Sequence, residues 1–142
     1  MVISLRNMEP EELSDRLWAF SARVGKVVDA LPDTRLGRHV ANQLVRCGAA
    51  PGPNYDEGRV GESRADFTHK VNIALKEQVE TRGWLKFVVI AELLPARRIN
   101  ILWDECDQLC RILGKSVATA RANGKPSRKP ASHIGLQITN SQ

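Results

Sequence analysis

The chain has 142 residues, of which 42% are hydrophobic and only 5% aromatic, and it contains three cysteines. This length and composition fit one small domain with a single core. Glycine and proline are scarce through most of the chain, which argues against a sandwich or barrel with frequent turns and favours a mainly helical protein. The best apolar run, Phe87 to Ala91, is stopped by Glu92 and falls far short of the roughly 18 residues that span a bilayer.

Positive charge is concentrated at the C-terminal end of the chain. The net charge is +5; residues 1–110 carry 15 Lys and Arg and all 16 Asp and Glu, whereas residues 111–142 carry cations only. These cations are Arg111, Lys115, Arg121, Lys125, Arg128 and Lys129. A basic end on a near-neutral body is typical of proteins that bind nucleic acid or an acidic surface, although such tails also serve solubility alone.

Two helices are predicted in the first third of the chain. Apolar residues recur at helical spacing over residues 10–31, and Pro32 ends this helix. Asp33 or Thr34 can cap a second helix that keeps one face apolar. The glycine- and proline-rich stretch at residues 48–58 must break or kink this second helix.

Two longer helices are predicted after this break. Ser63 suits the N-cap of a third helix, because Asp66 follows three residues later and the helical pattern continues without proline up to Leu94. A fourth helix over residues 96–122 carries its own apolar stripe, and Asn123-Gly124 is a suitable stop.

Four amphipathic helices with short connections predict an all-α fold, an antiparallel up-and-down four-helix bundle at residues 1–124. Residues 125–142 show no helical period, and we expect them to form a flexible, disordered basic tail. The acid-rich N-terminal region is unlike a secretory or transit peptide, so we expect a cytoplasmic protein.

Several motifs in order resemble one known family. Asn54-Tyr55-Asp56-Glu57-Gly58, the segment from Ser63 to Lys70 and the segment from Ala74 to Thr81 are similar to the bacterial four-helix-bundle proteins, also called the 23S ribosomal RNA intervening-sequence protein family. The likeness covers roughly residues 13–122. It implies a small bundle, a ring-like homopentamer and no enzymatic activity. A relative, the accessory variability determinant protein of diversity-generating retroelements, binds nucleic acid and a reverse transcriptase. The resemblance therefore also implies nucleic acid and a nucleic-acid enzyme as partners.

Two carboxylates on the third predicted helix indicate a polar network. Glu77 and Glu80 are three residues apart and share a helix face. We expect them to accept hydrogen bonds from Arg46 and Asn54, with Glu57 nearby, in a buried structural network between the second and third helices, because a buried carboxylate must be paired. The alternative is a metal-dependent enzyme built on Glu57, Glu77 and Glu80. Di-iron chemistry needs Glu-x-x-His pairs, which the sequence lacks, so we expect no metal.

Other chemistry has little support in the sequence. Cys47, Cys106 and Cys110 fit small core positions, since zinc needs a fourth ligand and usually a Cys-x-x-Cys motif. No nucleophile elbow or phosphate-binding loop is present, so we expect no catalytic residue and no cofactor. The three tryptophans, on separate predicted helices, are expected to pack within the bundle or between subunits.

The sequence thus favours a non-enzymatic homo-oligomer, a pentamer by resemblance, that binds RNA or DNA through charge and without strong sequence specificity. We expect phosphate contacts from the six C-terminal cations. The stretch Phe87–Ile90 is apolar nearly all round, which predicts that another subunit covers one side of it. The alternative from a different class is a protein-interaction scaffold whose tail is solubilising.

Overall fold

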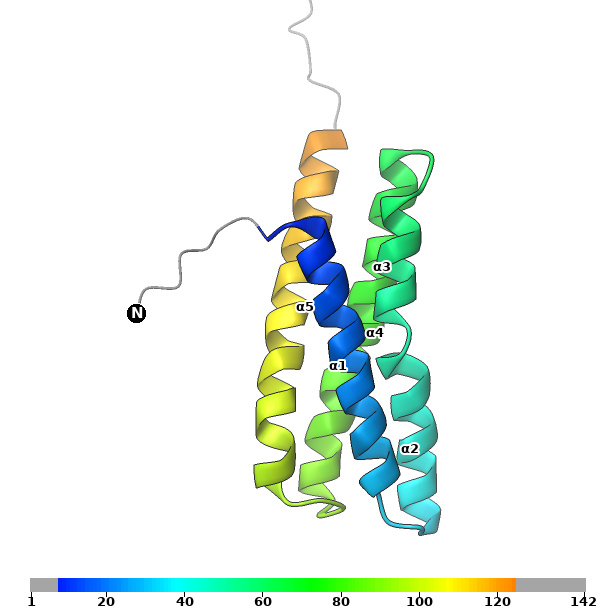
Figure 1. Cartoon of the computed structure of the whole chain (residues 1–142), viewed down its shortest axis with the longest axis vertical. Coiled ribbons are helices and arrows are strands. Elements are labelled where there is room, and N and C mark those ends of the chain that lie inside the picture. The colour runs from blue at the N-terminus through cyan, green and yellow to red at the C-terminus, as the bar shows by residue number, and fades with distance from the viewer. Residues whose placement is uncertain (1–7, 125–142) are drawn as a thin grey trace, which may run out of the picture.

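The computed structural model describes residues 8–124, which fold into five α-helices without any strand in that range (Figure 1). The helices are α1 (Pro10–Ala30), α2 (Arg35–Gly48), α3 (Pro51–Arg59), α4 (Arg64–Ile90) and α5 (Ala96–Gly124). α2 and α3 follow one another along a single rod, so the helices form an antiparallel bundle of four rods (Figure 1). The predicted all-α four-helix bundle is confirmed. Residues 125–142, assigned to a tail, lie outside the described residues.

The rods pack around one continuous core. α4 packs against α2, α3 and α5, and α1 packs against the same three helices from the other side, which puts α1 and α4 at diagonal corners. The largest fully buried side chains come from every long helix, and they include Leu17, Phe20, Leu44, Leu85, Ile99, Leu109 and Leu113. None of the helices in residues 8–124 combines the length and apolar character needed to cross a bilayer.

The break between α2 and α3 is shorter than the sequence indicates. Only Ala49 and Ala50 separate the two helices, and most of the predicted breaking stretch is itself helical. Pro51 explains both facts, because it lacks the N–H that would continue α2 yet fits the first turn of a new helix. α3 therefore starts where α2 stops, slightly redirected.

Both ends of α4 are set by local hydrogen bonds. Ser63 caps the N-terminus, its side chain accepting from the Asp66 N–H at 3.1 Å. At the other end the helix stops at Ile90, four residues before the predicted limit. The Leu93 N–H donates to the Val88 carbonyl and the Glu92 N–H to the Val89 carbonyl, the pattern of a Schellman motif. Glu92 has a φ of 57°, a left-handed conformation that favours glycine.

The apolar end of α4 is mostly covered by its own chain. Val88 is fully buried, and Phe87 and Val89 pack partly buried against the core. Only Ile90, with 68% of its surface exposed, projects into solvent. The exposed apolar surface of this stretch therefore reduces to one side chain, and the expectation that another subunit covers one side of it stays a prediction.

Candidate nucleic-acid interface

The predicted contacts on α5 lie on the surface but differ in their pairing. Arg111, Lys115 and Arg121 are all exposed. The Arg111 Nε donates to the Asp107 carboxylate at 3.1 Å, and the same carboxylate accepts from Arg82 at 2.8 Å. Lys115 and Arg121 make no ion pair within residues 8–124. Arg111 is thus partly neutralised, and the unneutralised charge belongs to Lys115 and Arg121.

A further cation joins this end of the bundle. Arg64, in the first turn of α4, donates through one guanidinium nitrogen to the Asn123 carbonyl at 2.5 Å. This contact ties the beginning of α4 to the end of α5 and satisfies one of the terminal carbonyls of that helix. Lys125, Arg128 and Lys129, the remaining predicted contacts, lie outside the described residues.

The predicted polar network is divided in the structure. Arg46 on α2 bridges Glu77, at 3.2 Å, and Glu80, both on α4. Asn54 instead donates to the Ala50 carbonyl at 2.9 Å, four residues earlier. Glu57 pairs with Lys70 at 2.8 Å. Including Asn54 and Glu57 in the network was therefore wrong.

The cause of this division is the separate helix α3. It carries Asn54 and Glu57 alongside the first half of α4, whereas Glu77 and Glu80 lie two to three turns further along. The expectation of burial was also wrong, since the Arg46 side chain is 52% exposed. Its hydrogen bond to Glu80 raises the pKa of Arg46 above the ordinary value, so this cation stays charged and bridges α2 to α4 at the surface.

The structure does not assemble the metal-enzyme alternative. That alternative requires Glu57, Glu77 and Glu80 to converge, and Glu57 faces Lys70 instead. Across residues 8–124 no group of three or more His, Cys, Asp or Glu side chains is placed to hold a metal ion.

The cysteines occupy the core, as the sequence indicates. Cys47, Cys106 and Cys110 are buried free thiols. The Cys106 thiol accepts from the Gln78 side-chain amide and donates to the Gln78 carbonyl, both at 3.3 Å. Hydrogen bonding with Cys110, together with burial, raises the pKa of Cys106, and burial raises the pKa of Cys47. The Cys47 and Cys106 thiols are therefore held protonated, the opposite of what a nucleophile or a zinc ligand needs. The hydrogen bond with Cys106 lowers the pKa of Cys110 instead.

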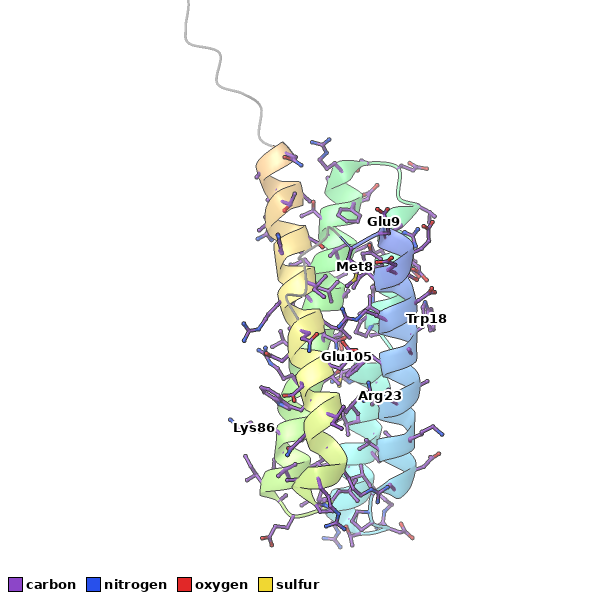
Figure 2. The ribbon with its side chains drawn as sticks, turned by 60° about the vertical axis from the view of Figure 1, so that its left-hand side comes forward. Met8, Glu9, Trp18, Arg23, Lys86 and Glu105 are labelled. Carbon is purple, nitrogen blue, oxygen red and sulfur yellow. The ribbon has the colours of Figure 1, made fainter. Side chains whose placement is uncertain are left out.

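One carboxylate that sequence reasoning missed joins α1 to α3. Asp56 accepts from the Ser14 hydroxyl at 2.6 Å and from the Trp18 indole N–H at 2.8 Å. Trp18 stands on the outer side of α1 (Figure 2) and its ring covers Gly52, where a Cβ would lie 3.0 Å from the ring. This tryptophan is a packing residue. Trp84 likewise packs edge-on against His39 and Phe87.

The sequence reasoning also missed a group of cations at the other end of α5. Arg97 and Arg98 in its first turn face Arg23 and Lys26 of α1 around a pocket. The adjacent arginines directly after Pro95 are a visible signal in the sequence. Their meeting with α1 depends on how the two helices pack, which the sequence pattern does not give.

The fold and surface define a small helical bundle with exposed, unneutralised cations near both ends of its last helix. The chain belongs to the 23S rRNA-intervening sequence protein family, whose sequence model matches residues 14–115. This confirms the resemblance seen in the sequence motifs.

A solved structure supports the same grouping. The crystal structure of a protein of unknown function from the S23 ribosomal protein family of Bacteroides thetaiotaomicron is 27% identical to this chain, with a TM-score of 0.69. The match covers 74% of this chain and 97% of that one. No match is found among curated proteins.

Proposed function

We propose that this protein binds RNA or DNA through phosphate contacts from the C-terminal end of its bundle, without catalysing a reaction and without strong sequence specificity. The observation that carries the proposal is the charge distribution. All 16 acids lie in residues 1–110, and six cations without an acid follow. The name of the family, which refers to an intervening sequence in 23S rRNA, supports RNA as the first ligand to test.

The contacts we propose are Lys115 and Arg121 on α5, assisted by Arg111 and followed by Lys125, Arg128 and Lys129. Lys115 and Arg121 are exposed, and no acid anywhere in residues 111–142 competes for them. Phosphate contacts of this kind carry affinity but no base choice. Because Arg111 is shared with Asp107 and some cations point away from a bound strand, we expect two to four effective contacts, and thus a log-log salt slope of roughly −2 to −4.

The test is a titration of labelled RNA and duplex DNA with full-length protein at three salt concentrations. We expect two variants to bind more weakly and to show a flatter salt slope. One combines Lys115→Gln with Arg121→Gln, and the other changes the three tail cations to Gln. The matched control is Arg35→Gln with Lys76→Gln, which removes two exposed, unpaired cations elsewhere. Salt-independent binding, or equal losses in the control and the α5 variant, would reject these contacts. No binding by the native protein at low salt would favour the scaffold alternative.

We also propose that the chain acts in the cytoplasm as a homo-oligomer, with five subunits by family resemblance. The physical support lies on the outer face of α4, where Val79 is 42% and Ile90 68% exposed. These residues are eleven apart, so they share one face. Gly83 lies between them, where an added Cβ would meet nothing within 4 Å, so a second helix can approach closely.

Light-scattering mass at tens of micromolar tests this assembly. The native chain should give a multiple of 15.8 kDa, and Val79→Glu with Ile90→Glu should shift it toward the monomer while helix content is retained. A native monomer at that concentration would refute the proposal.

A further inference from the structure

A pocket between α1 and α5 gathers cations without any acidic residue in its lining. It has a volume of about 280 Å³ and is lined by Arg23, Lys26, Val27, Leu94, Arg97, Arg98, Ile101 and Leu102. Val27, Leu94 and Leu102 are buried and form an apolar floor. The four cations are exposed around it. The pocket therefore combines an apolar base with a ring of positive charge.

The cations at this pocket are not neutralised by the protein. Seventeen lysines and arginines fall within residues 8–124, and ten of them make no ion pair there. Four of those ten line this one pocket. Residues 1–7 and 125–142 contain no Asp or Glu, so no acidic side chain outside the described residues can pair with them. A positive potential of this kind attracts anions.

The packing of α1 against α5 explains why these residues meet. The two helices are antiparallel, and the pair between Arg16 and Glu105 fixes which residues lie opposite each other. Seven residues further along α1, about 10.5 Å at 1.5 Å per residue, Arg23 lies opposite Arg98. Figure 2 shows Arg23 and Glu105 along this boundary, with Arg23 nearer the end where α5 begins. The Arg16–Glu105 pair thus lies about two helical turns away from the pocket.

The beginning of α5 adds to the positive potential. Arg97 and Arg98 stand in its first turn, which contains no acidic residue, although the helix dipole favours acids there. α1 and α4 place acids in their first turns. The arginines of α5 therefore add their charge to the positive end of the helix dipole, and a bound anion would relieve the repulsion.

We propose that this pocket binds the terminal phosphate of a nucleic-acid strand, with the attached sugar against the apolar floor. A terminal phosphate monoester carries close to two negative charges at neutral pH, whereas an internal phosphodiester carries one, so four converging cations favour the strand end. The volume lies near the lower limit of small-molecule sites, about 300 Å³, which is enough for a terminal phosphate and its sugar. This inference rests on the proposed function and adds a site near the opposite end of α5, about 36 Å from Arg121 at 1.5 Å per residue.

The test compares eight-nucleotide RNAs of one sequence that carry a 5′-phosphate, a 3′-phosphate or hydroxyls at both ends, titrated with full-length protein. One of the phosphorylated RNAs should bind about tenfold more tightly than the hydroxyl-ended RNA, because charge-assisted hydrogen bonds to a dianion are gained. Arg23→Gln with Arg98→Gln should abolish this difference. The control pair, Arg35→Gln with Lys76→Gln, should keep it while removing the same charge.

The outcomes separate this site from the proposed function. Equal binding of all three RNAs, with a normal salt slope, overturns the pocket and leaves the proposed function standing. A phosphate preference that survives in the pocket variant, or that disappears equally in the control, also overturns it. Uridine 5′-monophosphate tested alone identifies the source, because binding as tight as that of the phosphorylated RNA would assign the pocket to free nucleotides and reject a strand-end site. Failure of every RNA to bind at low salt rejects the strand-end site, and the proposed function is rejected as well only if duplex DNA also fails to bind.

Discussion

Removing the carboxylate of Asp56 should destabilise the bundle by detaching α3 from α1. Its two oxygens accept from the Ser14 hydroxyl at 2.6 Å and the Trp18 indole N–H at 2.8 Å. Ser14 is only 8% exposed, whereas Trp18 is 47% exposed. In Asp56→Ala the Ser14 hydroxyl is left buried without its partner, and the tryptophan loses the group that holds it over Gly52.

The magnitude follows from the difference in burial. A hydrogen bond to a charged group contributes about 1.5–3 kcal/mol, and a buried orphaned group costs about 1–3 kcal/mol. Because the Asp56 side chain is 40% exposed, we assign the hydrogen bond from Ser14 the lower end of the range for charged groups. The hydrogen bond from the exposed Trp18 contributes less than this. The expected loss is about 2 kcal/mol in the free energy of unfolding, or roughly 4–8 °C in the melting temperature of a chain this size.

Urea denaturation followed by circular dichroism measures this loss. The control is Glu57→Ala, the next residue, which removes the same charge but only a surface pair with Lys70 and should change stability by no more than about 0.5 kcal/mol. Ser14→Ala combined with Asp56→Ala should cost less than the sum of the single changes, because the orphaned hydroxyl is gone. Equal stability of Asp56→Ala and Glu57→Ala would refute the assignment.

Other expectations follow from the helix end, the surface bridge and the thiols. Glu92→Gly should stabilise the protein by about 0.5–1 kcal/mol in denaturant titrations, because glycine adopts the left-handed conformation freely; Glu92→Ala should not. Glu80→Ala should lower the melting temperature less than Asp56→Ala, since its partner Arg46 is largely solvated. The raised pKa values of Cys47 and Cys106 mean that the unfolded thiols ionise first. Stability should therefore fall as pH rises above about 8.5, and replacing both cysteines with alanine should flatten that fall.

Features coded by neighbouring residues could be predicted from the sequence. The Thr34 hydroxyl accepts from the Gly37 N–H and Ser63 caps α4, as their positions before apolar periodic stretches indicate. The four-rod fold follows from four such stretches with short connections. The sequence predicts an end of α4 four residues too late, because the motif that stops the helix uses Glu92 in a conformation usually reserved for glycine or asparagine.

Features that depend on distant residues were less accessible. The pairing of Arg46 with Glu77 and Glu80 is predictable because helical periodicity puts both carboxylates on one face. The positions of Asn54 and Glu57 are not predictable in this way, because a separate helix that begins at Pro51 carries them. The cations around Arg23 and Arg98 were missed because only the packing of α1 on α5 brings them together.

The contact between Gln78 and Cys106 bears on how α5 is aligned along α4. Gln78 is fully buried, and its side-chain oxygen finds no hydrogen-bond partner in residues 8–124. The amide thus adds little net stability, although its nitrogen donates a hydrogen bond to the Cys106 thiol. If α5 shifted by one turn, about 5.4 Å, so that Leu102 lay opposite Gln78, the amide nitrogen would lose its hydrogen-bond partner as well. A single buried polar residue can select one helix alignment in this way. Gln78 therefore disfavours this shift of α5, in which an apolar side chain would replace the thiol that its amide nitrogen contacts.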